Sequence, residues 1–357
     1  MQRELQPHPV ASGALDEALV RLADAGPEYR GGLSNHGPMV AEALAALGRD
    51  RAIAGWVEAY RKRLEPAPPR QTRIDPQHWR ECLGDRNRHA DWAEFFAEEL
   101  REAAWREVLG IWVPRLAPGL IGAAAHGLLR TGHAARALQA LETPPRFAEL
   151  AQGLAYWAAV YQEVPAPVAS RDPLRVPSRA LPPADAVLQI PVLPPDARSQ
   201  AGRIAPRLAP LAGFAPFAVV PGLIDPSSDP MGFHARMTGA FAQVFLQSPR
   251  RQRIVFVHAL TGPVALRSLL PALNPPARVV AMRHAWHAAA ALQAAFGAPL
   301  RMTAPPLPPH PDPAELADLA IENGDAHAIK FIEACLREWD PSRNPAFLHA
   351  AARMLRG

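Results

Sequence analysis

Residues 90–109, ADWAEFFAEELREAAWREVL, carry the clearest fold signal in the sequence. Trp92, Phe95, Phe96 and Trp105 recur at helical spacing between charged residues, which predicts one long packing helix over the stretch. The same periodicity recurs along most of the chain. It predicts further helices over 14–25, 35–48, 50–64, 119–129, 134–141, 147–160, 235–246, 263–270, 279–296, 313–322, 325–339 and 345–355.

Patterns with the two-residue period of strands are scarce, and the best candidates, Arg253–Val257 and Ala186–Val192, are short. Two proline-rich stretches, 164–197 and 304–313, are expected to be extended connectors, because proline lacks an amide donor and restricts the residue before it. We therefore predict a mainly α fold with little or no β-structure, formed by a single multi-helix domain over 1–357. A division into two domains at the first proline-rich stretch is the alternative.

The composition describes a globular protein with nearly balanced charge. The 357 residues include 38 Lys+Arg and 34 Asp+Glu, a formal net charge of +4, and 49% are hydrophobic, which excludes a disordered chain. The basic residues are scattered, and the run Arg61-Lys62-Arg63 is too small for a nucleic-acid-binding face. Cys82 and Cys335 are too few for a zinc–cysteine site or a disulfide framework. No signal peptide or membrane span is recognisable, so we expect a cytoplasmic protein.

The motifs of several common enzyme classes are missing, including GxGxxG after a strand, GxxxxGK[ST], HExxH, GxSxG and the HD dipeptide. What remains is a set of histidines in apolar or small-residue settings, namely His36, His126, His258 and His327. Each one alone is more often a hydrogen-bonded core residue than a ligand. Four widely separated ones, most of them in or beside predicted helices, nevertheless suit a metal centre built from inward-facing side chains, and imidazole suits iron, zinc, copper or nickel.

Lysine is rare in this chain, since Lys62 and Lys330 are the only two among 38 basic residues. On a helix, Lys330 would lie on the same face as His327, three residues earlier, within reach of one centre. It would also lie beside Glu333 and Arg337, so a solvated polar stripe is the alternative. A second group with helical spacing is His126, Arg130 and His133, provided that Gly132 does not end the helix.

Several of these stretches together resemble one protein family. Residues 35–38 (NHGP), 125–133 (AHGLLRTGH), 257–261 (VHALT), 325–330 (DAHAIK) and 333–335 (EAC) resemble, in order and over nearly the whole chain, the questin oxidase-like family. The resemblance implies a mostly α-helical fold and an enzyme that oxidises or cleaves a ring of polyketide-derived anthraquinones. It also implies a mononuclear non-haem iron.

The resemblance further implies a ligand set of four histidines and a carbamylated lysine. Carried over by motif, the ligands here would be His36, His126, His258, His327 and Lys330. Carbamylation requires a neutral amine, which burial favours by lowering the pKa of a lysine, whereas arginine stays protonated. Four imidazoles and one carbamate oxygen leave about one octahedral position for dioxygen or substrate.

Further site residues follow from the same motifs. The candidate catalytic residues are Lys330, His133 and Arg130, and the candidates for orienting the ligands are Asn35, Arg130, His133, Asp325 and Glu333. The candidates for an aromatic pocket are Trp56, Tyr60, Tyr156 and Trp157.

We expect an aromatic or quinone-like substrate, dioxygen, and neither nucleic acid nor membrane as partners. The family chemistry draws on a nicotinamide reductant, yet no nicotinamide-binding motif is present, so the electrons would come from the substrate, free NADPH or a partner reductase. Two alternatives stay open. One is a metal-free helical scaffold, in which the four histidines would not converge. The other is a zinc hydrolase with a carbamylated lysine, although Asp325 is the only aspartate beside these motifs.

Overall fold

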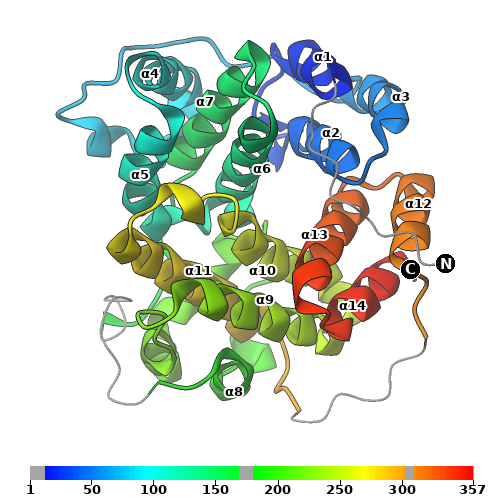
Figure 1. Cartoon of the computed structure of the whole chain (residues 1–357). Coiled ribbons are helices and arrows are strands. Elements are labelled where there is room, and N and C mark those ends of the chain that lie inside the picture. The colour runs from blue at the N-terminus through cyan, green and yellow to red at the C-terminus, as the bar shows by residue number, and fades with distance from the viewer. Residues whose placement is uncertain (1–12, 169–179, 201, 302–308, 357) are drawn as a thin grey trace.

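Helices form nearly all of the regular structure, as the apolar spacing predicts (Figure 1). The computed structural model describes residues 13–168, 180–200, 202–301 and 309–356. Its helices are α1 Gly13–Leu22, α2 Gly37–Ala46, α3 Asp50–Arg61, α4 His89–Glu102, α5 Trp105–Leu116, α6 His126–Ala140, α7 Pro144–Ala159, α8 Pro183–Ala186, α9 Pro230–Gln247, α10 Arg253–Leu266, α11 Pro275–Phe296, α12 Pro313–Asn323, α13 Ala326–Ser342 and α14 Pro345–Leu355, with short 3-10 turns between them. In the described residues, the one sheet pairs β1 Glu28–Tyr29 antiparallel with β2 Leu33–Ser34. The predicted mainly α fold is confirmed.

Four helices close a ring at the centre of the protein. Helix α2 packs against α6 and α13, and α10 packs against the same two helices from the other side. Figure 1 shows that this arrangement brings the blue N-terminal helices next to the orange and red C-terminal ones. Outer helices cover the ring: α7 lies on α6, α9 and α11 lie on α10, and α14 lies on α13. The ring therefore joins segments from both ends of the sequence.

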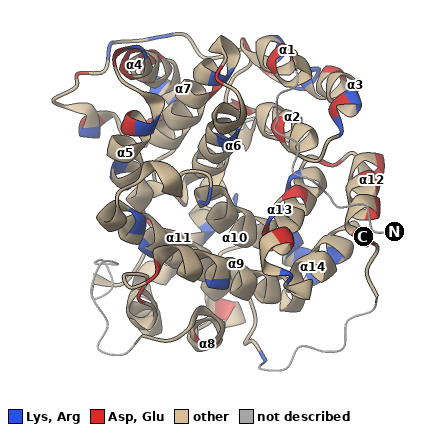
Figure 2. Ribbon diagram, viewed as in Figure 1, with Lys and Arg blue, Asp and Glu red and all other residues tan. Residues whose placement is uncertain are grey.

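Polar contacts on the surface also link the two ends of the chain. Helix α3 carries both signs of charge, whereas α12 carries acidic residues only (Figure 2). At their junction Arg49 Nε lies 2.7 Å from Asp318 Oδ1, and Trp56 Nε1 donates to the carbonyl oxygen of Gly324 at 2.9 Å. Exposed ion pairs contribute little stability, so these contacts mainly orient α12 against α3.

Helix α6 is longer than the sequence predicts, because Gly132 does not end it. Residues 126–129 and 134–140 of the two expected helices are instead joined in one helix, whereas the predicted helical start at 119–125 is wrong, because 3-10 and left-handed turns occupy it. A Cβ atom at Gly132 would lie 2.6 Å from the carbonyl oxygen of Ala265 on α10, and one at Gly127 would overlap the backbone of Trp157 on α7. Glycine is thus required here for close helix packing rather than for a turn.

The prediction of one long helix over 90–109 is wrong. The chain is extended at Ala103 (φ −137°, ψ 158°) and Ala104 (φ −60°, ψ 137°), which separates α4 from α5. The break lets the two helices pack on each other through aromatic rings, with the Phe96 and Trp112 centroids 5.0 Å apart. Burial of these rings outweighs the local preference of the alanines for helix.

The two predicted strand runs are also wrong. Residues 253–257 begin α10, and residues 186–192 form the end of α8 and a 3-10 turn. The β-branched residues of α10 are held helical by tertiary packing, which overrides their strand propensity. By length and composition residues 250–272 could cross a membrane, yet 83% of that window is buried within the fold, as in a core helix. Of the proline-rich connectors, 169–179 and 302–308 lie outside the described residues.

A left-handed turn leads into α6. Ala123 (φ 47°, ψ 36°), Ala124 (φ 56°, ψ 46°) and Ala125 (φ 65°, ψ 15°) all occupy the left-handed region immediately before His126. That conformation costs an L-residue about 1–2 kcal/mol. The turn places the carbonyl oxygen of Ala123 2.5 Å from Nδ1 of His126. Strain is therefore stored where the backbone presents a candidate site residue.

Replacing Ala123 by glycine should relieve part of this strain. We expect Ala123→Gly to raise the free energy of unfolding by about 0.5–1 kcal/mol, because glycine removes the left-handed penalty but gains entropy in the unfolded chain. The matched control is Ala54→Gly on the exposed face of α3. This substitution should lower the free energy of unfolding by about 1 kcal/mol. Urea unfolding followed by helical circular dichroism measures both. Changes of the same sign would contradict the strained turn.

Candidate metal centre

The helix ring places each of the four predicted histidines near its centre. His36 directly precedes α2, His126 is the first residue of α6, His258 lies within α10, and His327 is the second residue of α13. Three of the four therefore stand at helix N-termini. The helix dipole there disfavours a protonated imidazole and favours a nearby anion.

Local capping contacts fix two of these helix starts. Asn35 Oδ1 accepts a hydrogen bond from the backbone nitrogen of Gly37 at 2.9 Å, while its Nδ2 donates to the carbonyl oxygen of Gly26 at 3.0 Å. At α13, Asp325 Oδ1 accepts from the backbone nitrogens of His327 and Ala328, at 2.9 and 3.1 Å. Asn35 and Asp325 thus orient the backbone that carries His36 and His327, as an N-cap does.

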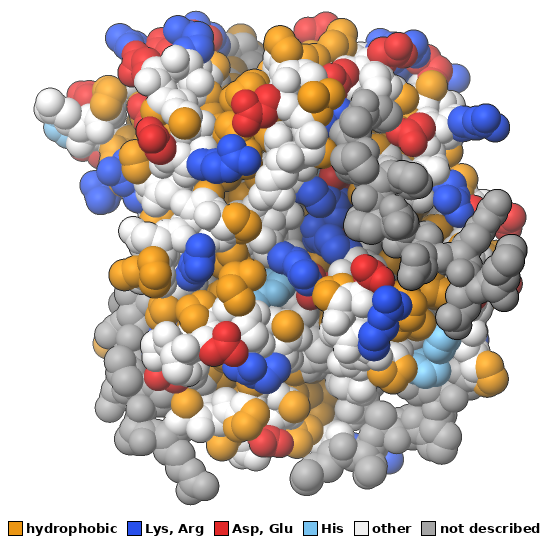
Figure 3. All heavy atoms as spheres, in the orientation of Figure 1, with side chains coloured by type: hydrophobic (Ala, Val, Ile, Leu, Met, Phe, Trp, Pro, Cys, Tyr) orange, Lys and Arg blue, Asp and Glu red, His pale blue; other side chains and the backbone are white. Residues whose placement is uncertain are grey.

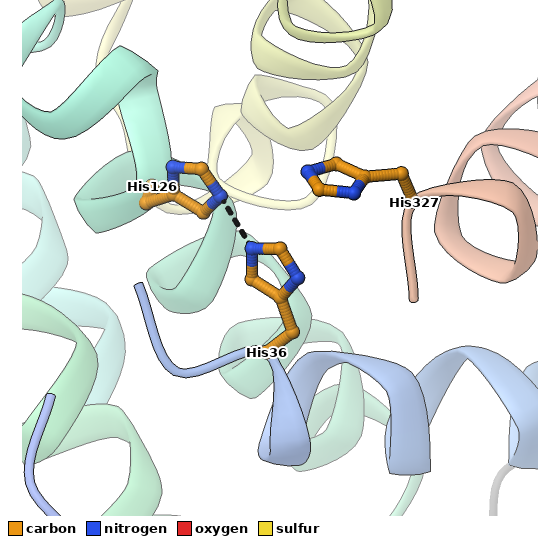
Figure 4. Close-up of side chains that lie close together, drawn as sticks. All are labelled: His36, His126 and His327. Atoms are coloured by element: carbon orange, nitrogen blue, oxygen red, sulfur yellow. Dashed lines mark hydrogen bonds between the residues drawn. The ribbon is translucent and has the colours of Figure 1, made fainter. Parts of the chain in front are cut away.

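The four imidazoles converge. Nε2 of His126 lies 2.8 Å from Nε2 of His36 and 3.4 Å from Nε2 of His258. Potential ligand nitrogens of His36, His126 and His327 all lie within 4.8 Å of one another, and Figure 4 shows these rings directed at one another from three helices. Two nitrogens on one metal ion are at most about 4.2 Å apart, given metal–nitrogen bonds of about 2.1 Å. The spacing is therefore close to that of a metal site, with His258 joined through His126.

Hydrogen bonds to the main chain select the tautomer of two rings. His126 Nδ1 donates to the carbonyl oxygen of Ala123 at 2.5 Å, and His258 Nδ1 donates to that of Ile254 at 2.7 Å. In the neutral rings each Nε2 then carries a lone pair, and these two lone pairs face each other. One proton on His36 Nε2 can satisfy only one of them. A cation between the rings would satisfy both, so the donor set fits a metal ion.

Burial keeps the rings neutral. The pKa values of His36, His126 and His258 lie well below the usual histidine range, first because of burial and then because of the neighbouring histidines and Lys330. Burial, and after it the charge of Lys330, lowers the pKa of His327 to about 3. Neutral imidazole is the form that binds metals.

Lys330 lies on the interior side of the histidines. Its side chain is buried, and it shares a void of about 10 Å³ with His258, His327 and His133. Burial lowers the pKa of Lys330 to about 7, against a small opposing effect of Asp325. No described carboxylate forms an ion pair with it. Because Glu333 is buried as well, the alternative of a solvated polar stripe does not hold.

A buried ionic network lies behind Lys330, where α2, α6 and α13 meet. His133 Nδ1 donates to Glu42 Oε2 at 2.6 Å. Arg136 pairs with both Glu42 and Glu333, and Arg337 Nε lies 3.7 Å from Glu333 Oε1. Figure 3 shows Lys and Arg side chains gathered in a recess over this junction. The network links α2, α6 and α13, and it holds His133 and Glu333 beside Lys330.

Arg130 is not brought to the histidines. Its guanidinium makes two hydrogen bonds to Glu149 on α7, at 2.6 and 2.8 Å, and it lines neither the void nor the cavity described below.

The four aromatic candidates fall into two groups. Trp56 and Tyr60 line the cavity, whereas Tyr156 and Trp157 are buried away from it.

The histidines form part of the wall of a cavity of about 810 Å³, within the size range of small-molecule sites. Trp56 and Tyr60 stack at 4.7 Å on this wall, and the hydroxyl of Tyr60 accepts a hydrogen bond from the backbone nitrogen of His36 at 2.8 Å. Sequence reasoning missed the lining residues Tyr29, Arg63 and Arg203. They belong to no motif, and only the folded chain brings them together.

Comparison with known proteins supports part of this interpretation. Residues 33–190 match the family model described as questin oxidase-like, a segment that contains His36 and His126. No curated protein matches the chain. The convergence of the histidines is the opposite of what the metal-free scaffold alternative predicts. Over residues 33–190 the chain is therefore similar to the questin oxidase-like family, which confirms the resemblance of its motifs and indicates an oxidase-type role.

Proposed function

We propose that this protein is a non-haem iron-dependent oxidoreductase that activates dioxygen to oxidise, or cleave a ring of, an aromatic or quinone-like substrate. The observation that carries the proposal is the convergence of four neutral imidazoles on the wall of a cavity large enough for a polycyclic substrate. When bound, iron supplies the one-electron chemistry that reactions of dioxygen require.

The donor set favours a single iron over the zinc hydrolase alternative. His36, His126, His258 and His327 would hold the metal, with Lys330 as a carbamate ligand. Two-metal hydrolases with a carbamylated lysine draw on several aspartates. Among the described residues that line the cavity with the histidines, the one aspartate is Asp325, and its carboxylate is engaged in capping α13. A mononuclear centre needs no further acidic ligand.

The surroundings of Lys330 support its carbamylation. The amine is buried without a described ion-pair partner, so its neutral form is favoured. The carbamate would place a negative charge near the N-termini of α2, α6 and α13, where the helix dipoles stabilise anions. His133 has Nδ1 committed to Glu42, which leaves Nε2 available to orient the carbamate.

The cavity supports a flat aromatic substrate. Trp56 and Tyr60 offer a stacking surface for an aromatic ring. The small side chains of Ala123 and Ala124 leave space for that ring beside the histidines. The guanidinium of Arg63 lies 5.0 Å from the Tyr60 ring centroid and would face an oxygen substituent of the bound ring. Arg130 acts indirectly in this proposal, by holding α6 against α7 through Glu149. NADPH would serve as a diffusible reductant or through a partner reductase.

Metal content tests the centre directly. We expect about one iron per chain in protein purified under low oxygen, and loss of most of it in His258→Gln, since a ligand is removed. His234→Gln is the matched control, because His234 is equally buried but donates to the carbonyl oxygen of Pro263, away from the cluster. Elemental mass spectrometry measures both variants. Wild-type protein that binds no iron even after iron and bicarbonate are added back would refute the proposal.

Removing the lysine tests the carbamate. We expect Lys330→Ala to lower both bound iron and dioxygen consumption by about 100-fold, and small carboxylates such as acetate to restore part of each. Lys330→Arg should behave like the alanine variant, because arginine cannot be carbamylated. Lys62→Ala, at the exposed second lysine, is the control. An active arginine variant would show that only a cation is needed.

Shortening the aromatic wall tests substrate binding. With a hydroxylated anthraquinone as substrate and an oxygen electrode as the readout, Trp56→Ala should raise KM about tenfold with a smaller effect on kcat, since a stacking contact is lost. Trp339→Ala, outside the cavity, should leave KM unchanged. Equal effects of the two substitutions would place the substrate elsewhere.

A further inference from the structure

A second cavity, away from the histidines, is lined by arginines. It has a volume of about 250 Å³ and lies between the end of α9, the start of α10 and α14. Arg250, Arg253, Arg353 and Arg356 line it together with His349, and the rest of the lining is aliphatic. Figure 2 shows that α14 carries Lys or Arg and no acidic residue.

Nothing in the described part of the chain neutralises these four arginines, because none of them forms an ion pair with a described carboxylate. The hydrogen bonds of Arg253, Arg353 and Arg356 go to backbone carbonyl oxygens instead. Arg353 donates to Leu246 and Ser248, Arg253 donates to Met354 and Arg356, and Arg356 donates to Pro309. Carbonyl oxygens hold the guanidiniums in place but leave their positive charges uncompensated. Arg250 and Arg253 further lower the pKa of Arg353, after the effect of burial.

The position of the arginines adds to this unfavourable charge. Arg250 and Arg253 stand at the N-terminus of α10, where the helix dipole is positive and cations are destabilising. Two like charges at the positive end of a helix repel each other, and an anion bound between them would offset that repulsion. The cavity between them is where an anion would sit.

The shape and lining of the cavity define the class of anion. Arginine forks match the oxygens of phosphate with paired hydrogen bonds. Among the described residues, no Trp, Tyr or Phe lines the cavity, so they offer no ring for stacking a nucleobase. We propose that this cavity is a binding site for a phosphate group, either inorganic phosphate or the phosphoryl end of a small metabolite.

Consecutive residues of α10 line the two cavities. Arg253 lines the phosphate cavity, and the next residue, Ile254, lines the histidine cavity and accepts the hydrogen bond from His258 Nδ1. The first turn of α10 thus separates the two sites.

Calorimetric titration of the full-length protein with inorganic phosphate, pyrophosphate and glycerol phosphate tests the proposal. Sodium chloride at equal ionic strength is the reference. We expect saturable binding of phosphate that is absent with chloride, and about tenfold weaker binding in Arg250→Gln and Arg356→Gln, each of which removes one charged donor. Arg21→Gln, an exposed arginine on α1, is the matched control and should bind as wild type does.

The comparison of inorganic phosphate with glycerol phosphate separates the two sources of the phosphate group. Tighter binding of glycerol phosphate than of inorganic phosphate would support the phosphoryl end of a metabolite, and the reverse order would support the free ion. Heat no greater than that of chloride, or binding unchanged in both Arg250→Gln and Arg356→Gln, would overturn the proposal. Thermal unfolding of each variant in chloride confirms that it is folded before it is titrated.

Discussion

The meeting point of α2, α6, α10 and α13 depends on keeping basic side chains uncharged inside the protein. Four imidazoles and one lysine come together there, and protonated rings at these separations would repel one another strongly. Burial and three helix N-termini both disfavour protonation. Neutral rings carry the lone pairs that a metal ion needs. The neutral state of these buried side chains therefore allows the helices to pack and also prepares the proposed centre.

The two sides of this meeting point differ in character. On one side a cavity of about 810 Å³ with aromatic and small residues gives access to the histidines. On the other side the buried network of Glu42, Arg136, Glu333 and His133 fixes the helices and leaves almost no free volume around Lys330. The network fixes the histidine cluster on one side, and the cavity leaves it accessible on the other. This arrangement suits a site that a substrate approaches from one direction.

The helical class and the four histidines could be predicted from the sequence, because helix period and residue setting are local signals. The failures are tertiary. Ala103 and Ala104 break a helix without any glycine or proline, and Gly132 continues one because α10 must approach closely. No sequence rule predicts three alanines in the left-handed region before His126, since alanine has no preference for it. Tyr29, Arg63 and Arg203 are likewise recognisable only once the chain is folded.

The ring has a consequence for how the centre is assembled in the cell. His36 and His126 are synthesised well before α13, which carries His327 and Lys330. Domains generally fold from the N-terminus during translation. The proposed ligand set therefore stays incomplete until α13 has left the ribosome. Unlike a zinc finger, which folds around its ion, this protein would form its core first and acquire the proposed metal afterwards, through the cavity that reaches the histidines.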